Sequence, residues 1–346
     1  MRILLATDAW QPQVNGVVRT LSHCVRELED GWGDEVNVVS HATFTAQGTR
    51  TWSLPSYKEI QLVFPSRAAV AAQFEAFEPE AVHVATEGPI GLAVRRHAIR
   101  HGLPFTTGYH TRFPEFVSSR VPVAAGLVER ATYRWIKRQH SGSRAVLAPT
   151  QAITDDLRAR GFRNVVTWTR GVDHTTFHAD VEPVDYGHTG PVVVHCGRIA
   201  VEKGVEDFLR ADVPGHPDAL KVVIGDGPQR ARLEKAYPHV HFLGYRFGDE
   251  LAAHLAGGDI FCFPSRNDTF GLVMVEAMAC GLPVAGYPVP GPIDVVEHGR
   301  SGFLDEDLGR AMAGALALSR EDALARAATF TWRETARQLR AALVPF

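Results

Sequence analysis

The segment SRNDTFGLVMVEAMACGLPV, residues 265–284, contains two carboxylates, one before an apolar run and one within it. Asp268 follows the segment DIFCF, residues 259–263, and Glu276 comes eight residues later within LVMVEAMA, which predicts a helix. A buried charge is costly without a partner, and the apolar neighbours of Glu276 leave little room for a solvent-exposed acid. A carboxylate beside a ligand can accept hydrogen bonds from two adjacent hydroxyl groups, as on a ribose. Glu276 is therefore a candidate ligand contact, and the alternative is an acid that points to solvent.

The backbone at the start of the same helix is a second candidate contact. Asp268 or Thr269 can cap this helix, and Gly271, directly after Phe270, lets the main chain come close to a ligand. The block therefore combines an acid, a permissive backbone and a second acid within one strand–helix turn.

Two cations follow the strand candidate 191–196. Arg198 lies just past the end of this strand, and Lys203 comes five residues later at the start of a helix. An arginine fork and a lysine point charge together suit a diphosphate. The alternative is an exposed basic pair, but a place at the carboxyl end of a parallel strand favours a ligand site.

Glycine turns follow two other strand candidates. Asn15-Gly16 precedes a helical pattern after 2–6, and a glycine there lets backbone N–H groups approach an anion, with a plain turn as the alternative. Gly225 and Gly227 follow the strand candidate 221–225 without the third glycine of a dinucleotide fingerprint. This spacing favours a tight turn over NAD binding.

A histidine stands at the end of another strand candidate, 104–107. The segment TTGYHTRFPEF, residues 106–116, places His110 between Tyr109 and Arg112. A histidine there could contact a reacting sugar hydroxyl or a phosphate. Most of the 16 histidines must be structural or on the surface, and His110 is the one whose placement predicts chemistry.

Basic, aromatic and aliphatic side chains are mixed across residues 112–144, with two acids among them. This composition is typical of a helix that lies on anionic lipid, and the alternative is an ordinary amphipathic helix over a sheet. The candidate acceptor or membrane contacts are Tyr109, Arg112, Arg120, Arg130, Arg134, Lys137 and Arg138.

The elements that must position these residues are short β-branched runs that alternate with helical patterns, which predicts parallel βαβ units. We expect an α/β fold of two Rossmann-like, doubly wound domains that face each other across a cleft. The expected parts are a domain over 1–172, a linker over 173–190, a domain over 191–330, and a helix over 331–346 that crosses back to the first domain. The strand candidates are 2–6, 35–40, 81–85, 104–107, 145–148 and 165–168, then 191–196, 221–225, 239–243, 259–263 and 283–285.

Composition limits the class of protein. The chain has 346 residues, 45% of them hydrophobic and 22% charged, and no apolar run reaches the roughly 18 residues of a membrane span. Residues 1–170 carry 20 Lys+Arg against 15 Asp+Glu, and the remainder 16 against 24, which suggests two domains with different partners. The net charge of −3 gives no sign of nucleic acid, and four scattered cysteines fit a reducing cytoplasm. No His/Cys cluster is seen, and the acids at 305–307 fit helix capping, so no metal is expected.

Taken in order, these motifs resemble the retaining glycosyltransferases of family four, which have the GT-B fold. The resemblance spans nearly the whole chain, and its most specific part is PSRNDTFGLVMVEAMACGLPV. The segments TDAWQPQVNGVVRTL, ATEGPIGL and YHTRFPEF are similar to the branch that holds sulfoquinovosyl- and glucosyl-diacylglycerol synthases and lipid-linked mannosyltransferases. The matching motifs are Asn15-Gly16-Val17, Arg170-Gly171-Val172-Asp173 with Phe177, Gly197-Arg198, Glu202-Lys203-Gly204 and Gly225-Asp226-Gly227-Pro228.

The resemblance implies a role for each matching position. Arg198 and Lys203 would hold the donor diphosphate, with Asn15, Gly16 and Gly225 also on the donor, and Glu276 would take the ribose hydroxyls. Asp268 and the Phe270-Gly271 backbone would hold the transferred sugar, and His110 would lie near it. Members of the family usually have Glu at position 268, so this chain keeps the E-x7-E spacing with an acid one methylene shorter.

The resemblance implies a retaining hexosyltransferase that takes a nucleotide-diphosphate sugar of the UDP-glucose or UDP-glucuronate type, with no metal. The first domain would bind the acceptor and the second the nucleotide sugar. We expect a lipid acceptor such as diacylglycerol, an anionic membrane partner, and a cytoplasmic protein that is peripheral on the inner face of the plasma membrane. The alternatives are a GDP-mannose-dependent α-mannosyltransferase, a nucleotide-sugar 2-epimerase and a non-catalytic sugar-nucleotide binding protein.

Overall fold

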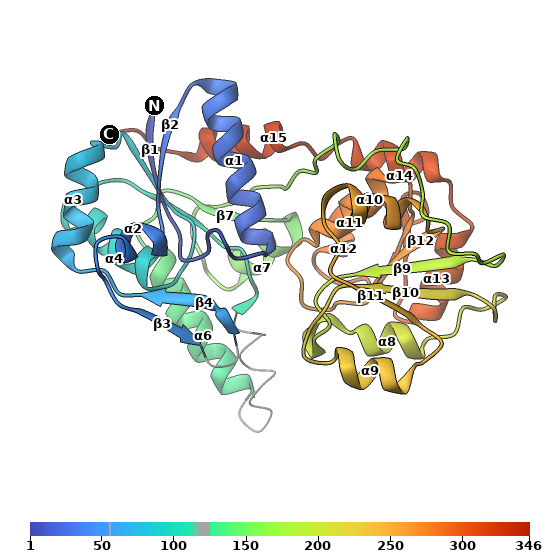
Figure 1. Cartoon of the computed structure of the whole chain (residues 1–346). Coiled ribbons are helices and arrows are strands. Elements are labelled where there is room, and N and C mark those ends of the chain that lie inside the picture. Colours follow the sequence, from blue (N-terminus) through green and yellow to red (C-terminus); the bar gives the residue numbers. More distant parts are fainter. Residues whose placement is uncertain (55–56, 114, 116–124) are drawn as a thin grey trace. The chain divides into compact units, whose positions relative to one another are not determined.

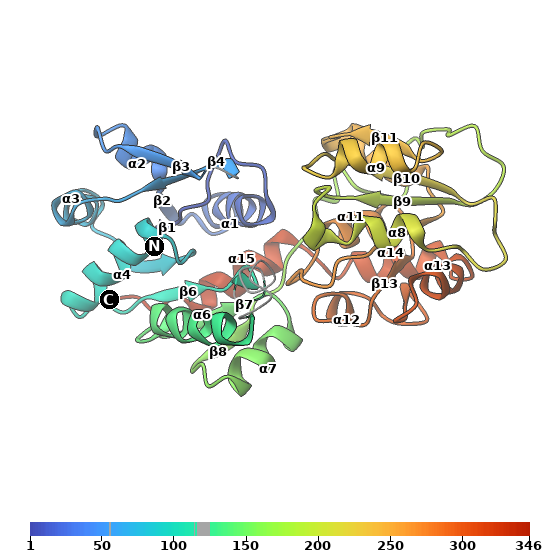
Figure 2. The same cartoon turned by 90° about the horizontal axis from the view of Figure 1, so that it is seen from below.

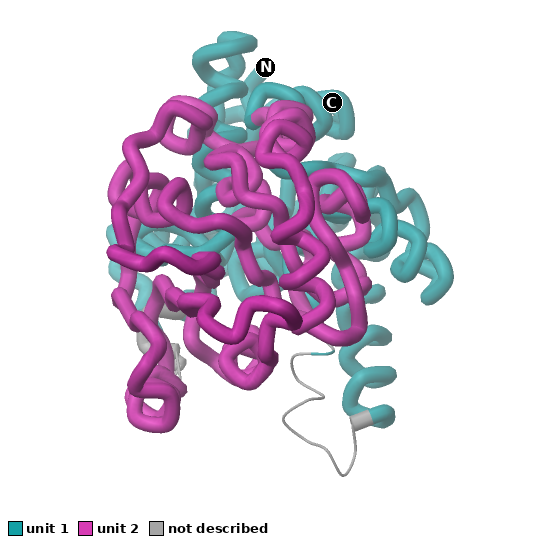
Figure 3. Tube along the Cα trace, turned by 90° about the vertical axis from the view of Figure 1, so that its right-hand side faces the viewer, with its two compact units in different colours: residues 1–170, 332–346 teal, residues 171–331 magenta. Residues whose placement is uncertain are grey.

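The chain folds into two compact α/β units, each with its own sheet and core (Figures 1 and 2). The computed structural model describes residues 1–54, 57–113, 115 and 125–346. Unit 1 comprises residues 1–170 together with 332–346, and unit 2 comprises residues 171–331 (Figure 3).

Unit 1 is built on a six-stranded parallel sheet in the order β2-β1-β5-β6-β7-β8. The central strands β1 (Arg2–Ala6) and β5 (Ala81–Val84) are buried, because helices cover both faces of the sheet, and they therefore read as apolar runs. The order reverses between β1 and β5, which makes the loops after these two strands the expected ligand position. The other strands are β2 (Glu35–Val39), β6 (Thr106–Gly108), β7 (Val146–Ala148), β8 (Val165–Thr167), and an antiparallel hairpin of β3 (Thr51–Leu54) and β4 (Tyr57–Val63).

Alternate residues of β1 belong to two different cores of unit 1. Ile3 and Leu5 pack with the first and last helices of the chain, whereas Leu4 and Ala6 pack with residues of α3 and α4 on the other face. This alternation is the period-two pattern of a strand buried on both sides. The helices of unit 1 are α1 (Gly16–Trp32), α2 (His41–Thr45), α3 (Arg67–Phe77), α4 (Pro89–Arg100), α6 (Ala125–His140), α7 (Gln151–Ala159) and α15 (Trp332–Ala342).

The C-terminal helix α15 is part of unit 1. The Trp332 ring stacks on His23 of α1 with ring centroids 4.5 Å apart. Trp168 donates its indole N–H to the carbonyl of Thr335 at 2.9 Å. These contacts, together with the burial of Ala336 and Leu339 in the core, fix the last helix on the first sheet.

Unit 2 repeats the architecture with a parallel sheet in the order β11-β10-β9-β12-β13-β14. Its strand order reverses between β9 (Val192–Cys196) and β12 (Ile260–Phe263). The other strands are β10 (Leu220–Ile224), β11 (His241–Gly244), β13 (Val284–Gly286) and β14 (Gly302–Leu304). The helical segments are the 3₁₀ turn η2 (Val201–Lys203), α8 (Val205–Arg210), α9 (Arg230–Ala236), α10 (Gly248–Ala256), α11 (Leu272–Ala279), α12 (Pro292–Val295), α13 (Leu308–Leu316) and α14 (Arg320–Ala327).

The predicted α/β class with two Rossmann-like units is confirmed, and each predicted strand has a counterpart whose ends shift by a few residues. Sequence reasoning missed the β3–β4 hairpin and β14. The hairpin alternates polar and apolar residues weakly, and β14 is three residues long, GFL, so neither has the continuous apolar run that marks a central strand.

Candidate active site

The reversal point of the unit 2 sheet holds an ion pair between two predicted site residues. Lys203 ends η2 in the loop after β9, and Asp268 lies in the loop after β12. The Lys203 Nζ atom lies 2.6 Å from Asp268 Oδ1, and the side chains are 31% and 22% exposed. The structure therefore brings together, at the carboxyl edge of the sheet, a cation of the kind that binds phosphate and an acid of the kind that accepts from hydroxyl groups.

The carboxylate of Asp268 is held in its charged form. Burial by itself raises the pKa of Asp268, but the Lys203 ammonium and the Ser265 hydroxyl outweigh this effect and bring the pKa below its ordinary value. Its second oxygen, Oδ2, is buried and accepts no hydrogen bond from the described residues. Asp268 thus retains an acceptor position for the hydroxyl group of a ligand.

Glycines let the loops of this edge lie directly against one another. An added Cβ on Gly204, which has a φ of +65°, would lie 2.5 Å from the carbonyl oxygen of Pro264. A Cβ on Gly225, with a φ of +134°, would lie 2.0 Å from the carbonyl oxygen of Gly197, the residue before Arg198. Glycine is required at both positions by backbone conformation and by space, so Gly225 shapes the loop that carries Arg198.

The remaining donor candidates of unit 2 lie around the same edge. Arg198 is half-buried just after β9. Phe270 is buried and packs edge-on against Phe330 with ring centroids 5.7 Å apart, so its side chain is a core element and its backbone is the part that can meet a ligand. Gly271 begins α11 in the left-handed region, with a φ of 83°. A Cβ there would lie 2.8 Å from side-chain atoms of Phe263 and Met274.

Glu276 is buried in α11 with 3% of its surface exposed. Its helix neighbours from Met274 to Ala279 are buried too, so the alternative of an acid on a solvated face is wrong. The carboxylate also raises the pKa of the Cys280 thiol, after the larger effect of burial, which places the two side chains close together.

One polar residue of this region was not anticipated. His195 lies in β9, 2% exposed, with Nδ1 3.0 Å from the carbonyl oxygen of Cys262. A carbonyl only accepts hydrogen bonds, so Nδ1 carries the hydrogen, and Nε2 is a buried acceptor with no partner in the described part of the chain. Burial, followed by the nearby Lys203, lowers the pKa of His195 to about 4. The available signal was a histidine in an otherwise apolar strand, directly before Gly197-Arg198.

The loop after β1 in unit 1 forms the expected helix start. The Asn15 side chain accepts hydrogen bonds from the N–H groups of Val17 and Val18, both at 3.0 Å, and caps α1. Gly16 is the first residue of α1 and is exposed. The N-terminus of a helix attracts anions, so Gly16 lies where a phosphate could be bound.

Asp8 organises the reversal point of the unit 1 sheet and was missed by sequence reasoning. Its carboxylate accepts from the Thr86 hydroxyl at 2.8 Å and from the N–H of Ile90 at 2.9 Å, which caps α4 from the end of β1. Burial raises the pKa of Asp8 against the opposing effect of these hydrogen bonds. The signal was an acid directly after the first strand.

His110 is half-buried beside the guanidinium of Arg170. Arg170 Nη2 lies 3.4 Å from His110 Nδ1, and Nη1 donates to the carbonyl of Trp168 at 2.6 Å. Because an arginine can only donate, Nδ1 is the acceptor and the ring is neutral with its hydrogen on Nε2. Burial, Arg170 and the imidazoles of His83 and His140 all hold the pKa of His110 well below its ordinary value. A neutral His110 is a hydrogen-bond donor toward a ligand.

The predicted acceptor or membrane residues fall into four groups. Tyr109 is buried in the core of unit 1, with 1% of its surface exposed. Arg112 is half-buried and donates to Glu115 at 2.9 Å, so it is part of an internal ion pair. Arg120 lies outside the described residues. The exposed group on α6 consists of Arg130, Arg134, Lys137 and Arg138.

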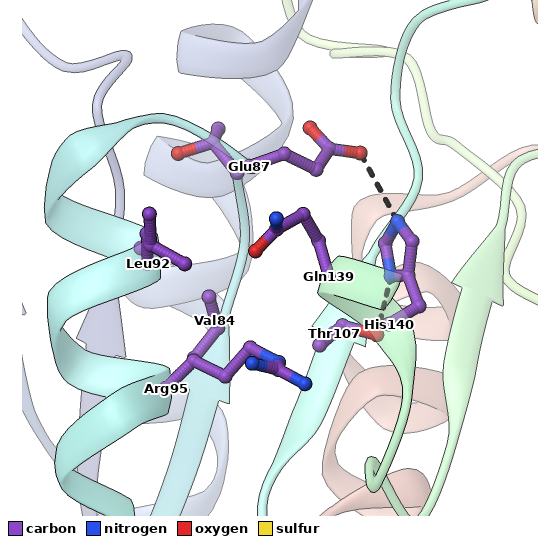
Figure 4. Close-up of a pocket in the computed structure, with 9 residues that line it drawn as sticks. Val84, Glu87, Leu92, Arg95, Thr107, Gln139 and His140 are labelled. Atoms are coloured by element: carbon purple, nitrogen blue, oxygen red, sulfur yellow. Dashed lines mark hydrogen bonds and ion pairs between the residues drawn. The ribbon is translucent and has the colours of Figure 1, made fainter. Parts of the chain in front are cut away.

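A small pocket of about 10 Å³ lies between α4 and α6 above β5 and β6 (Figure 4). His140 connects two of its walls, since Nε2 lies 3.2 Å from Glu87 Oε1 and Nδ1 lies 2.8 Å from Thr107 Oγ1. Figure 4 shows Gln139 and Arg95 beside this chain of hydrogen bonds. Sequence reasoning did not single out this pocket, because its members come from four separate segments.

Within residues 1–54, 57–113, 115 and 125–346, no group of three or more His, Cys, Asp or Glu side chains could hold a metal ion. In the same ranges, no helix is both long enough and apolar enough to cross a membrane.

The two units and their edges define a glycosyltransferase with the GT-B fold. Two doubly wound sheets carry glycine-shaped loops, a capped helix start, acids and cations at the carboxyl ends of their strands. Sucrose-phosphate synthase from Thermosynechococcus elongatus has the same fold, with a TM-score of 0.75 over 98% of this chain and 97% of that one at 18% identity.

The particular family follows from sequence similarity. Residues 14–176 match the model of Glycosyltransferase Family 4, and residues 190–321 match the model of Glycosyl transferases group 1. The chain is 32% identical over 328 residues to a GDP-mannose-dependent alpha-mannosyltransferase of Mycobacterium tuberculosis, covering 88% of this chain and 83% of that protein. It is 30% identical over 328 residues to the sulfoquinovosyl transferase SQD2 of Arabidopsis thaliana, covering 84% and 61%. The chain belongs to glycosyltransferase family 4 and is a retaining hexosyltransferase that uses a nucleotide sugar.

Proposed function

We propose that this enzyme transfers a hexose from a UDP-glucose or UDP-glucuronate type donor to a lipid acceptor such as diacylglycerol. The observation that carries the donor half is the 2.6 Å pair of Lys203 and Asp268 at the reversal point of the unit 2 sheet. A diphosphate offers Lys203 a stronger partner than one carboxylate, and a sugar hydroxyl suits the open oxygen of Asp268. Binding of the donor then separates Lys203 from Asp268, whose charges otherwise neutralise each other.

The site residues would share the donor as follows. Arg198 and Lys203 hold the diphosphate, with Gly225 shaping the loop and Asn15 and Gly16 presenting a helix N-terminus to phosphate. Glu276, buried in α11, accepts from the two ribose hydroxyls. Asp268 and the Phe270-Gly271 backbone hold the transferred sugar, and the neutral His110 donates to it.

The reaction proceeds by attack on the anomeric carbon from the face that the diphosphate leaves. The bond from the sugar to the phosphate oxygen breaks, the acceptor hydroxyl forms the new bond, and the departing phosphate oxygen takes the acceptor's proton. Arg198 and Lys203 stabilise the charge that develops on the phosphate, which is where fixed cations contribute most to rate. No protein carboxylate needs to form a covalent bond with the sugar in this scheme.

The lipid acceptor is supported by surface chemistry and by relatives. The exposed cations of α6 give unit 1 a surface that suits anionic lipid, and such a surface would hold the enzyme peripherally on the inner face of the membrane. One relative, 29% identical over 80% of this chain, is a phosphatidylinositol dimannoside mannosyltransferase of Mycobacterium tuberculosis. Membership of a transferase family supports transfer over the epimerase and non-catalytic alternatives.

A second candidate donor is GDP-mannose, because the 32% identical relative is a GDP-mannose-dependent alpha-mannosyltransferase. One experiment separates the candidates. The protein is incubated with UDP-glucose, UDP-glucuronate or GDP-mannose, with and without diacylglycerol liposomes, and free UDP or GDP is measured. Release that depends on a UDP sugar and on liposomes is the expected result.

The same experiment can contradict the proposal in separate parts. Release from GDP-mannose alone would mean that GDP-mannose is the donor. Release that is equal with and without diacylglycerol would contradict the lipid acceptor. Arg198→Ala and Glu276→Ala should each abolish turnover. Arg310→Ala is the matched control, because this exposed arginine pairs with Asp305 outside the proposed site and should leave turnover unchanged.

A further inference from the structure

A groove between α4 and α6 gathers four arginines of unit 1. Its empty volume is about 1020 Å³ and it opens to solvent. The two helices lie side by side in both views (Figures 1 and 2). We call this feature the α4–α6 groove and define it by Arg95, Arg96, Ile99 and Arg100 of α4 and Trp135 and Arg138 of α6.

The charge of the groove is uncompensated. The helix α4, PIGLAVRRHAIR, contains three arginines and a histidine and no acid. In the described part of the chain, Arg96, Arg100 and Arg138 form no ion pair. Other exposed arginines do, including Arg300 with Asp322 and Arg310 with Asp305. A cluster of like charges repels itself, so its presence indicates an anionic partner that is absent here.

Arg95 gives the groove a fixed wall. Its Nη2 atom donates to the carbonyl of Arg138 at 2.8 Å and to the carbonyl of Ser141 at 2.9 Å, which joins α4 to the end of α6. Its Nε is buried and has no hydrogen-bond partner among the described residues. Burial, followed by Arg138 and Arg96, lowers the pKa of this guanidinium. The groove is therefore held in place by a side chain that joins its two helices.

Apolar side chains stand at the same surface. Trp135 is 42% exposed and Ile99 is 49% exposed, next to the arginines. A tryptophan beside cations is typical of the boundary between lipid headgroups and acyl chains. A free phosphate ion would use the cations alone, whereas a lipid bilayer would use both the cations and the apolar side chains.

We propose that the α4–α6 groove binds the phosphate headgroup of an anionic lipid in a membrane. Arg96, Arg100 and Arg138 hold the phosphate through forked hydrogen bonds, and Trp135 and Ile99 enter the headgroup layer. This inference rests on the proposed lipid acceptor, and it adds a separate contact on α4 that binds the membrane whether or not a sugar is transferred.

Vesicle binding tests the proposal. Vesicles of phosphatidylcholine, with and without phosphatidylglycerol, are sedimented with the wild-type protein, with Arg96→Gln/Arg100→Gln, and with the control Arg300→Gln/Arg310→Gln. Two arginines near an anionic surface are expected to change binding by roughly 30-fold. The groove variant should lose this much affinity for phosphatidylglycerol vesicles, while the control, which removes the same charge elsewhere, should bind like wild type.

Three further measurements define the outcomes. Thermal unfolding shows that each variant is folded, and Trp135→Ala should weaken vesicle binding without a change of charge. Equal binding by the groove variant and wild type would overturn the proposal. Binding of inorganic phosphate to the wild type in calorimetry, with no binding of phosphatidylglycerol vesicles, would overturn the membrane as the source of the phosphate.

Failure of the proposed function is distinguishable from failure of this inference. Donor turnover in the absence of vesicles should be the same for Arg96→Gln/Arg100→Gln and wild type, because neither arginine belongs to the donor site. Vesicle binding that depends on the groove, with no transfer to diacylglycerol, would leave the groove standing and remove the acceptor. Transfer to diacylglycerol, with no effect of the groove variant on vesicle binding, would contradict the groove and support the lipid acceptor.

Discussion

The Lys203 ammonium lies 2.6 Å from the Asp268 carboxylate, across the point where the strand order of the unit 2 sheet reverses. The two residues are 65 positions apart in sequence and come from loops after neighbouring strands. Each is the nearest charged partner shown for the other. The pair therefore keeps both charges in place at the site before any ligand arrives, and a ligand that carries phosphate and hydroxyl groups can use both.

Asp268→Asn should weaken both proposed roles of this acid. The amide keeps the size of the side chain but removes the charge that positions Lys203 and accepts from a sugar hydroxyl. We expect kcat/KM to fall by roughly 10² to 10³, the usual effect of removing one positioned electrostatic contact. Asp268→Glu should keep most of the activity and change the ratio of rates with different donor sugars. Asp305→Asn, at a half-buried acid outside the site, is the control in the same donor-release measurement.

Gly225→Ala should destabilise unit 2 while the same change at Gly31 should not. A Cβ at Gly225 would lie 2.0 Å from the Gly197 carbonyl oxygen, at a φ of +134°, so backbone must move. We expect a loss of about 3 kcal/mol in the free energy of unfolding. Gly31 lies within α1, where a Cβ meets only a side-chain oxygen of Glu27 at 3.8 Å, and alanine should stabilise by about 1 kcal/mol. Urea titration measures both, and equal effects would contradict the packing of the two loops.

The residues of the unit 2 edge were predictable because their signals are local. Arg198, Lys203, Asp268 and Gly271 each follow a short apolar strand within a few residues, and parallel strands bring their carboxyl ends to one edge. Burial of Glu276 followed from its apolar neighbours in the same way. The place of each of these residues depends on one strand and on the loop that directly follows it.

Other parts of the site depend on contacts between distant segments and were not predictable. Tyr109 stands next to His110 in sequence, yet it is buried in the core and His110 is held by Arg170, sixty residues away. The chain of Glu87, His140 and Thr107 joins three segments that no spacing relates. The β3–β4 hairpin and β14 were missed for a different reason. The hairpin alternates polar and apolar residues and β14 is short, so neither has a continuous apolar run.

Acid should destabilise the protein from below about pH 6.5, because two buried histidines stay neutral in the fold. Burial lowers the pKa of His83 to about 3 and that of His195 to about 4, from 6.5. As the pH falls below 6.5, the unfolded chain takes up protons that the folded chain does not. The unfolded state is therefore stabilised relative to the folded state. Each histidine should contribute a loss of about 1.4 kcal/mol per pH unit between 6.5 and its folded pKa.

Urea titrations between pH 7.5 and about 4.5 test this slope. His195→Phe removes a titrating group from the unit 2 core and should make the loss of stability with acid shallower. His216→Phe is the comparison, because His216 lies in a loop of the same unit and not in a strand of the sheet. A slope that His195→Phe does not alter would contradict a neutral His195 in the folded state.

Arg170 should control both the tautomer and the titration of His110. Its guanidinium donates toward His110 Nδ1 at 3.4 Å, stacks on the Trp168 ring with its carbon 4.3 Å from the centroid, and is 3% exposed. Burial, Arg170, His83 and His140 depress the pKa of His110, in that order. Arg170→Met keeps an unbranched stem but removes the charge and the donor, so the pKa of His110 should rise and the tautomer should no longer be fixed.

The measurements are nitrogen NMR of the His110 ring and the pH profile of kcat/KM. In the wild type the hydrogen should reside on Nε2, and the rate should show no limb from His110 between pH 6 and 8. In Arg170→Met a mixture of tautomers is expected, and protonation of His110 should lower the rate toward pH 6. Arg170→Lys keeps the positive charge, so it should restore the low pKa of His110 without restoring the hydrogen bond. Arg163→Met, an exposed arginine of the same segment, should match the wild type in both measurements. An unchanged tautomer and pH profile in Arg170→Met would show that burial alone keeps His110 neutral.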